Sequence, residues 1–202
     1  MWLIFLTPIS IITLLFYYAS TGGFGDMPDL EVLENPKTNL ASEIFTSDGK
    51  TLAKYYFNDN RTPVTFDELP THLVDALIAT EDIRFYSHSG IDFKRTFGAA
   101  LKFGKDGGGS TITQQLAKLL FTGEGSKDII ERLTQKFKEY IIAVRLERNY
   151  TKEEIITQYL NLYDFGNNGD GIRSAARIYF GKEPIDLDIN ESAILVGMLK
   201  NS

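Results

Sequence analysis

The sequence predicts a mainly α-helical domain that carries one small β-hairpin and follows an apolar N-terminal helix. Three observations favour this class. Apolar residues recur every three or four positions through much of the chain after residue 65. Two short alternating segments flank an Asp-Gly pair, and residues 2–19 contain no charge. With 202 residues, 43% of them hydrophobic, the chain is long enough for one domain with a substantial core.

The first 20 residues are predicted to form a transmembrane anchor. A helix needs about 20 apolar residues to cross a bilayer, and the uncharged run from Trp2 to Ala19 nearly reaches this length. A cleaved signal peptide is the alternative, but its basic leader is missing and the apolar run is longer than usual. We therefore expect a single-pass anchor over 1–20 and, from its glycines, prolines and acids, a juxtamembrane linker over 21–41.

A β-hairpin is predicted next, near the membrane. Residues 43–46 and 51–57 alternate between apolar and polar side chains, and the intervening segment 47–50 contains Asp-Gly, which is typical of a tight hairpin turn. Residues 61–66 are a candidate for a third short strand.

Helices are predicted over most of the remaining chain. The first follows a capping-box pattern, Thr65 to Glu68, with Pro70 near its start. The longest has an apolar stripe that begins at Ile129 and ends at Val144. The expected helices span 70–81, 111–121, 127–147 and 151–161, with two shorter ones that start near 173 and 191.

The charge distribution indicates the kind of ligand. A net charge of −6 argues against nucleic acid as a partner. Between residues 94 and 152, however, the chain has twelve basic residues and only six acidic ones. Such a local cationic zone suits an anionic ligand or phospholipid headgroups.

Residues 107–118 form a glycine run that leads into a helix. The free amides of a helix start attract anions, and hydroxyl, amide and ammonium groups follow directly. The run is therefore a candidate seat for a phosphate or a sugar, although a loop capped by a Ser or Thr side chain is the alternative. The candidate binding residues here are Ser110, Thr111, Gln114, Gln115 and Lys118.

Glu81 is the candidate general base. It is predicted at the C-terminal end of a helix, where the negative end of the macrodipole and the neighbouring Asp82 both favour proton uptake. An exposed acidic helix end is the alternative. His88 is predicted to be a structural hydrogen-bonding residue.

A second charged group lies on the longest helix. Arg132, Lys136 and Glu139 are spaced so that they form a narrow stripe beside the apolar face, where side chains can line a site. An ordinary surface ion pair is the alternative interpretation.

Five motifs in a fixed order resemble those of a known family. The chain is similar to the peptidoglycan glycosyltransferase (transglycosylase) domain, glycosyltransferase family 51, of class A penicillin-binding proteins and monofunctional transglycosylases. The family motifs are E-D-x-x-F-x-x-H-x-G, G-x-S-T-I-T-Q-Q, R-K-x-x-E, K-x-E-I-L-x-x-Y-L-N and G-I-x-x-A-A-x-x-Y-F-G-K. Their counterparts here are 81–90, 109–118, 136–139, 152–161 and 171–182. In the third motif, Gln135 stands where the family usually has Arg.

The resemblance implies a lysozyme-like fold for 42–202 and a reaction with lipid II, the undecaprenyl-pyrophosphoryl disaccharide-pentapeptide. Glu81 would be the base that takes the proton from the acceptor's 4-hydroxyl, giving β-1,4-linked strands with inversion and release of undecaprenyl pyrophosphate. Glu139 would be the second catalytic carboxylate, either orienting the site or holding a divalent cation, Mg²⁺ or Mn²⁺; the need for a metal is open. Ser110, Thr111, Gln114, Gln115, Lys118, Arg132 and Lys136 would bind substrate.

The resemblance also implies a location and partners. The domain would lie on the periplasmic or external face of the bacterial inner (cytoplasmic) membrane, in contact with membrane lipids, the growing glycan strand and cell-wall synthesis proteins. Its C-terminal end is expected to be incomplete, because the family normally continues after the residues that match Leu199 to Ser202.

Two other functions compete with the transferase. A muramidase on the same fold would cut finished glycan, and a non-catalytic membrane-anchored module would only bind it. The residue chemistry favours a transferase, because a pyrophosphate leaves as a stable anion that needs cations, whereas hydrolysis of a glycoside needs a proton-donating acid and a second carboxylate.

Overall fold

The computed structural model places most of the chain after residue 60. It describes isolated positions between 7 and 23 and the segments 42–48, 51–55, 61–101, 109–123 and 128–199. Most of the predicted anchor over 1–20 and of the linker over 21–41 therefore lies outside the described residues. Within the described part of the chain, no helix combines the length and apolarity needed to span a membrane.

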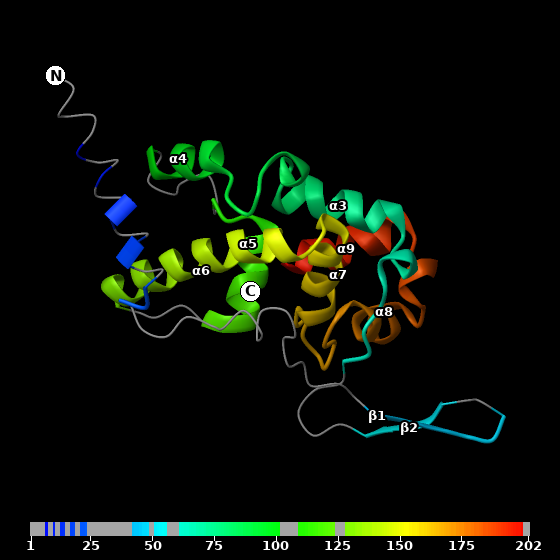
Figure 1. Cartoon of the computed structure of the whole chain (residues 1–202). Coiled ribbons are helices and arrows are strands. Elements are labelled where there is room, and N and C mark those ends of the chain that lie inside the picture. Colours follow the sequence, from blue (N-terminus) through cyan, green and yellow to red (C-terminus); the bar gives the residue numbers. More distant parts are fainter. Residues whose placement is uncertain are drawn as a thin grey trace.

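Two short strands precede the helical part. Strand β1 (Ser42–Phe45) pairs antiparallel with β2 (Thr51–Tyr55), and the register shifts between Ile44 and Phe45. In Figure 1 this pair lies at one edge of the helical domain.

The candidate third strand over 61–66 is wrong. Residues 61–65 have no strand partner, and Phe66–Glu68 form a short 3₁₀ helix, η1. The reason is a side chain that replaces a neighbouring strand. The Val64 N–H donates to Oδ1 of Asn161, and Asn161 Nδ2 donates to the Val64 carbonyl, both at 2.9 Å. One amide thus satisfies both backbone groups of Val64.

The first long helix, α3 (Thr71–Glu81), ends where the sequence predicts. The capping box of Thr65 and Glu68 belongs to η1, and Pro70 is the N-cap of α3. A 3₁₀ turn, η2 (Phe85–Ser87), follows.

Helix α4 (Phe93–Leu101) is not among the predicted helices. The signal that was available is Asp92, whose side chain accepts a hydrogen bond from the Arg95 N–H at 3.0 Å, as an N-cap does.

The predicted helix over 111–121 has two parts. Helix α5 (Ile112–Ala117) continues into a π-helix, η3 (Lys118–Thr122). The long helix α6 (Ile129–Asn149) follows, with Asp128 as its N-cap. Helices α7 (Lys152–Leu162), α8 (Ile172–Phe180) and α9 (Ile189–Met198) follow close to the predicted positions, and a 3₁₀ turn, η4 (Pro184–Asp186), lies between α8 and α9.

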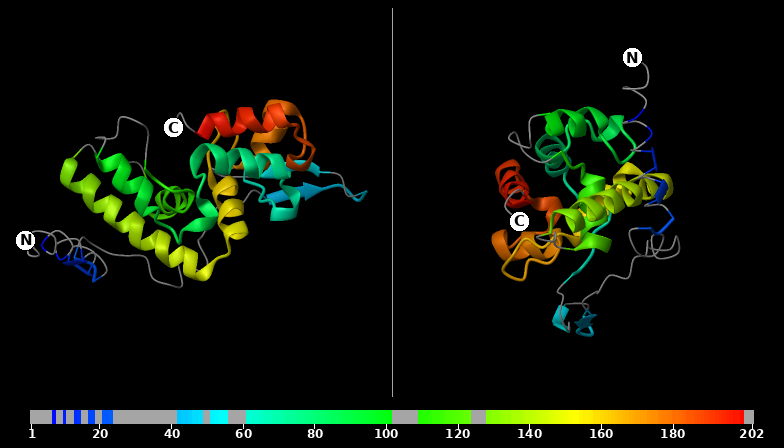
Figure 2. Two further views of the ribbon diagram at one scale, coloured as in Figure 1. Left: turned by 90° about the horizontal axis from the view of Figure 1, so that it is seen from above. Right: turned by 90° about the vertical axis from the view of Figure 1, so that its left-hand side faces the viewer.

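The apolar stripe predicted for α6 is only partly correct. Ile129, Ile130 and Leu133 are 57–75% exposed, whereas the buried face begins at Glu139 and continues through later turns. The first turns of α6 extend beyond the helices that cover its second half (Figure 2).

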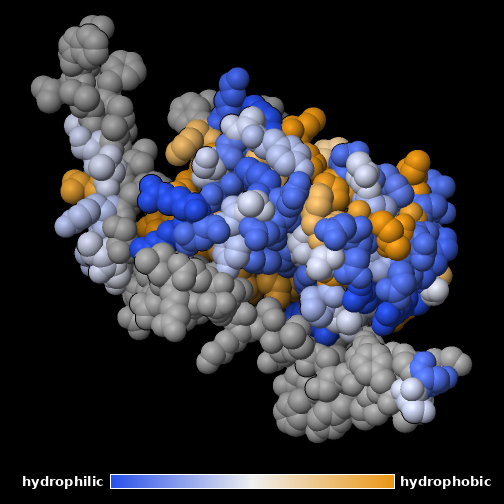
Figure 3. All heavy atoms as spheres, turned by 45° about the vertical axis from the view of Figure 1, so that its right-hand side comes forward, coloured by the Kyte–Doolittle hydropathy of each residue, from blue (hydrophilic) through white to orange (hydrophobic). Residues whose placement is uncertain are grey.

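Helices α3 and α5 to α9 share one hydrophobic core. Helix α5 packs against α6 and α7, and α3 packs against α9 (Figures 1 and 2). Burying one large apolar side chain completely stabilises the folded state by about 1.5–3 kcal/mol. On the face shown in Figure 3, hydrophobic side chains are interrupted by hydrophilic ones. The largest fully buried side chains include Tyr159, Phe85, Leu73, Leu77, Ile112, Leu116 and Ile142.

Gly90 provides a test of how the loop after α3 is fixed against α6. Its φ is +88°, and an added Cβ would lie 2.8 Å from the carbonyl carbon and oxygen of Ala143. We expect Gly90→Ala to lower the free energy of unfolding by at least about 2 kcal/mol in urea denaturation, because strain and a backbone clash combine. Gly98→Ala in α4, where an added Cβ meets nothing within 4 Å, is the control. Equal losses in the two variants would contradict this account.

Candidate active site

The buried carboxylate of Asp82 joins the end of α3 to the start of α5. Asp82 is 1% exposed. Its Oδ2 accepts a hydrogen bond from the Ile112 N–H at 3.2 Å, and its two oxygens lie 3.0 and 3.1 Å from Nε2 of His88. The free amide at a helix start favours such an anion. His88 therefore has the structural role that the sequence predicts.

Glu81 is half-buried at the last position of α3 and is held by α5. Gln115 Nε2 donates to Oε2 of Glu81 at 2.8 Å, and the Arg95 guanidinium donates to the Glu81 backbone carbonyl. The other carboxylate oxygen, Oε1, has no hydrogen bond to the described residues. A carboxylate with one oxygen fixed and one free is suitable for accepting a proton from a bound hydroxyl.

Tyr159 completes this contact from α7. Its hydroxyl donates to Oε1 of Gln115 at 2.8 Å. Burial first, and then the negative charge of Glu81, raise the pKa of the Tyr159 phenol far above its ordinary range.

A second polar cluster lies where α6 meets the segment before α5. Lys136 Nζ donates to Ser110 Oγ at 2.6 Å and to Oε2 of Glu139 at 2.8 Å, and it lies 5.6 Å from the centroid of the Tyr140 ring. Glu139 is 8% exposed, and Thr122 Oγ1 lies 3.5 Å from its other oxygen. The structure thus brings together three of the predicted residues, Ser110, Lys136 and Glu139.

Two predicted cations are exposed. Lys118 and Arg132 have no side-chain hydrogen bond or ion pair with the described residues. Lys118 is also the first residue of the π-helix, and such turns occur often at functional sites. Both side chains are therefore accessible to an anionic ligand.

Thr111 and Gln114 have a different environment. Both are fully buried, and both donate to the Gly90 carbonyl, at 2.7 and 3.1 Å. They also form the capping box of α5. Their polar groups are used within the protein, so as placed they fix the loop rather than face a ligand. Among the described residues, their side chains bond to Gly90 and to each other, and not to the side chains of the other candidate binding residues.

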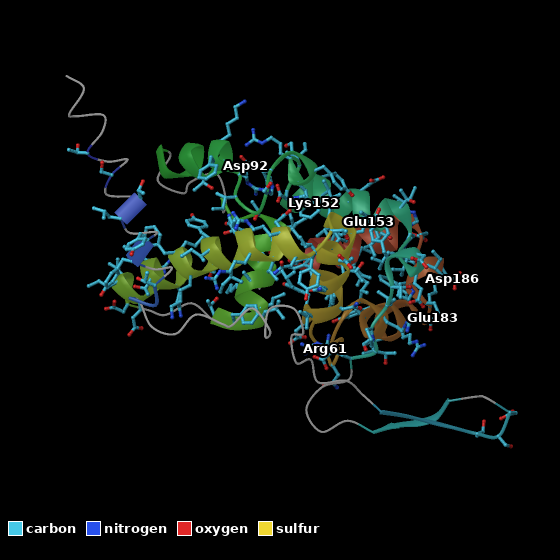
Figure 4. All side chains as sticks on the ribbon, in the orientation of Figure 1. Arg61, Asp92, Lys152, Glu153, Glu183 and Asp186 are labelled. Carbon is cyan, nitrogen blue, oxygen red and sulfur yellow. The ribbon has the colours of Figure 1, made fainter. Side chains whose placement is uncertain are left out.

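Lys152, which begins the fourth motif, connects several elements. Its Nζ donates to the His88 carbonyl at 2.7 Å, pairs with Oε1 of Glu147 at 2.8 Å and lies 4.2 Å from the centroid of the Phe85 ring. Thr113 Oγ1 donates to the same Glu147 oxygen at 2.5 Å. Figure 4 shows Lys152 at the start of α7, beside the loop after α3. Lys152 is not among the site residues predicted from the sequence.

Arg84 and Asp92 brace the loop on the side of α4. Arg84 donates from Nε and Nη2 to the two Asp92 oxygens at 2.7 and 2.9 Å. Asp92, labelled in Figure 4, is 5% exposed. A pocket of about 530 Å³ opens here, but neither Glu81 nor Lys136 lines it. Its lining residues are Arg84, Ser87, His88, Ser89, Ile91, Asp92, Phe93 and Lys94.

The divalent-cation prediction concerns Glu139. In the described segments, no three His, Cys, Asp or Glu side chains are grouped so that they could hold a metal ion. The Glu139 carboxylate is instead paired with Lys136. These residues do not form a cation site by themselves, and a cation there would need its other oxygen ligands from bound phosphates and water. The cation stays a prediction.

Comparisons with known proteins give one family. The family model described as transglycosylase matches residues 48–202. Penicillin-binding protein 1A of Escherichia coli is 38% identical over 179 residues, covering 86% of this chain and 20% of that protein. Penicillin-binding protein 1F of Bacillus subtilis is 42% identical over 166 residues, covering 80% and 22%. Penicillin-binding protein 1A of Vibrio cholerae is 37% identical over 179 residues, covering 87% and 21%. The chain thus spans about a fifth of the length of these relatives.

Asp92→Asn should reduce the loss of stability in acid. Burial alone raises the pKa of Asp92, but hydrogen bonds from Arg84 and Arg95 outweigh burial and lower it. A carboxyl with a lowered folded-state pKa adds stability that is complete above its unfolded pKa, about 3.9, and is lost as the pH falls through the folded value.

Urea denaturation at about pH 6 and about pH 2.5 checks this. We expect the wild-type protein to lose about 1 kcal/mol more between the two conditions than Asp92→Asn does. Asp75→Asn removes an exposed carboxylate of α3 and is the control. If Asp92→Asn kept the full acid dependence, the ion pair with Arg84 would not be its source.

Proposed function

This chain belongs to the transglycosylase family, and we propose that it is a peptidoglycan glycosyltransferase that polymerises lipid II into β-1,4-linked glycan strands and releases undecaprenyl pyrophosphate. The observation that supports this most directly is the exposed side of α5 and the π-helix. Gln115 on this side holds Glu81, and Lys118, one turn later, is free to meet an anion. One short helical segment therefore holds the base through Gln115 and carries a cation, Lys118.

The proposed reaction starts at Glu81. Its free Oε1 accepts the proton of the acceptor's 4-hydroxyl, and the oxygen attacks the anomeric carbon of the donor. The hydroxyl oxygen attacks from the face opposite the pyrophosphate as the bond from that carbon to the pyrophosphate oxygen breaks, and this inverts the configuration from α to β. The electron pair leaves with the pyrophosphate, whose negative charge Lys118, Arg132 and Lys136 stabilise.

Glu139 favours a transferase over a muramidase. A glycosidase needs one carboxyl group that carries a proton for the leaving sugar. Glu139 is instead ion-paired with Lys136, and Lys136 also contacts Ser110. In the proposal, Glu139 therefore positions a lysine for the diphosphate.

The lipid part of the substrate requires a membrane surface. Ile129, Ile130 and Leu133 are exposed on the first turns of α6, with Arg132 among them. Apolar side chains mixed with a cation suit the boundary between acyl chains and anionic headgroups. We propose that this end of α6 lies against the external face of the cytoplasmic membrane, where the domain meets lipid II and the growing strand.

Incubation of this chain with lipid II in detergent separates the alternatives. Long glycan polymer with release of undecaprenyl pyrophosphate supports the proposal. Release of muropeptides from finished glycan would instead support a muramidase, and binding without consumption would support a glycan-binding module. Repeating the reaction with a chelator tests the divalent cation.

Glu81→Gln should reduce lipid II polymerisation by at least about 100-fold, because the amide cannot accept the acceptor's proton. The rate of polymer formation measures this, and circular dichroism checks folding. Glu153→Gln is the matched control, since Glu153 is an exposed residue of α7 (Figure 4). Normal chain synthesis by Glu81→Gln would overturn the base assignment.

Lys118→Met should slow polymerisation by about 10- to 100-fold, because a charge-assisted contact to the diphosphate is lost. Arg148→Met removes one positive charge from the exposed end of α6 and should keep the rate within about twofold. If both variants slowed equally, the effect would come from net charge and not from a contact at Lys118.

A further inference from the structure

Three side chains from three helices form a directed hydrogen-bond chain that ends at the proposed base. The Tyr159 hydroxyl of α7 donates to the Gln115 carbonyl oxygen of α5, and the Gln115 amide nitrogen donates to Glu81 at the end of α3. Both bonds are 2.8 Å long. Tyr159 is fully buried.

We propose that Tyr159 is a positioning residue for the reaction: it fixes the amide orientation of Gln115 and thereby the carboxylate of Glu81. This inference rests on the proposed role of Glu81 as the base. Tyr159 itself does not touch the reacting atoms, because Gln115 lies between its hydroxyl and the carboxylate.

The orientation of the Gln115 amide is the reason. An amide has one end that accepts and one that donates, and an ionised carboxylate can only accept. Only the orientation with nitrogen toward Glu81 is favourable, and it leaves the amide oxygen facing the interior, where it needs a donor. Tyr159 supplies that donor. With phenylalanine there, the amide oxygen would have no partner in this orientation and the reversed one would compete.

The Tyr159 hydroxyl stays a donor throughout the reaction. Its phenol pKa is raised by burial and by the charge of Glu81, so the group keeps its proton at working pH. It is therefore no proton carrier. The proton from the substrate goes to the free Oε1 of Glu81, and the bond from Gln115 to Oε2 is unchanged.

Other charged and titratable side chains lie near Glu81, but they are bonded to groups other than its carboxylate. Asp82 follows in the chain and is occupied by His88 and α5. Arg95 from α4 contacts the Glu81 backbone carbonyl rather than its carboxylate. The side-chain contact with Gln115 is thus the one that a change at Tyr159 would alter.

Tyr159→Phe tests the inference because it keeps the ring and removes only the hydroxyl. In lipid II polymerisation by this chain, we expect kcat to fall about 10-fold with KM within about twofold, since only the base is disturbed. The acidic limb of the pH–rate profile should also move up by roughly half a pH unit, because a donor to the ionised carboxylate is less well fixed.

Tyr163→Phe is the matched control. Tyr163 follows the last turn of α7, its ring lies 5.8 Å from that of Tyr159, and its hydroxyl donates to the Leu199 carbonyl at 3.2 Å. This variant loses a buried hydroxyl bond of the same kind without contact to Gln115. It should leave the pH–rate profile in place.

A double variant tests whether Tyr159 acts through Gln115. On a Gln115→Met background, Tyr159→Phe should add less than about a twofold further loss, because the group it orients is gone. Additive losses, or an unchanged pH–rate profile in Tyr159→Phe, would overturn the inference. If Glu81→Gln is inactive while Tyr159→Phe matches the wild-type profile, the base stands and only the positioning role fails; an active Glu81→Gln would overturn the proposed function itself.

Discussion

The buried carboxylate of Asp82 is the contact on which the rest of the site depends. It follows Glu81 directly, and it binds both the first turn of α5 and the ring of His88. An unpaired charge at 1% exposure would be strongly destabilising, so these partners must stay in place. Because Glu81 is one residue away, the same contact sets where the proposed base stands relative to Gln115.

Some residues of the motif on α5 are buried and hold the fold together, whereas others lie at the candidate active site. Ile112, Thr113, Gln114, Leu116 and Ala117 are buried, whereas Gln115 is half-buried and Lys118 is exposed. Residues three apart share a side of a helix, so Gln115 and Lys118 lie on one side, which is less buried than the other described residues of α5. The polar residues on the other sides hold the loop at Gly90 and the Glu147 carboxylate. Neighbouring polar residues of similar kinds thus have two different roles, and the side of the helix on which each one lies decides its role.

The sequence predicted the helical class, most helix bounds and the positions of Glu81, Lys136 and Glu139, because caps and apolar periodicity are local signals. It gave no signal for the role that we propose for Tyr159, because the polar partner is 44 residues away and the ring looks like an ordinary core residue. It also assigned Gln114 and Gln115 alike, since identical neighbouring residues differ only in the direction they face. The prediction that the start of α6 is buried was wrong for a related reason. Periodicity shows that an apolar stripe exists, but it does not show which part of the stripe packs against another helix.

Polar contacts and the buried ring of Phe85 together hold the loop between α3 and α4, and the polar contacts determine how precisely its geometry is maintained. Ion pairs such as Lys152 with Glu147 add little net stability by themselves, since desolvation offsets their attraction. Instead, these buried polar contacts make alternative positions of the neighbouring helices unfavourable. If α5 moved by one turn, the buried Ile112 N–H would lose Asp82 and the buried Thr113 hydroxyl would lose Glu147, at about 1–3 kcal/mol for each unpaired donor. Apolar packing tolerates such a shift more easily, because one aliphatic contact can replace another. A reaction that needs a carboxylate oxygen placed to within a fraction of an ångström is therefore better served by this buried polar frame than by a larger apolar core.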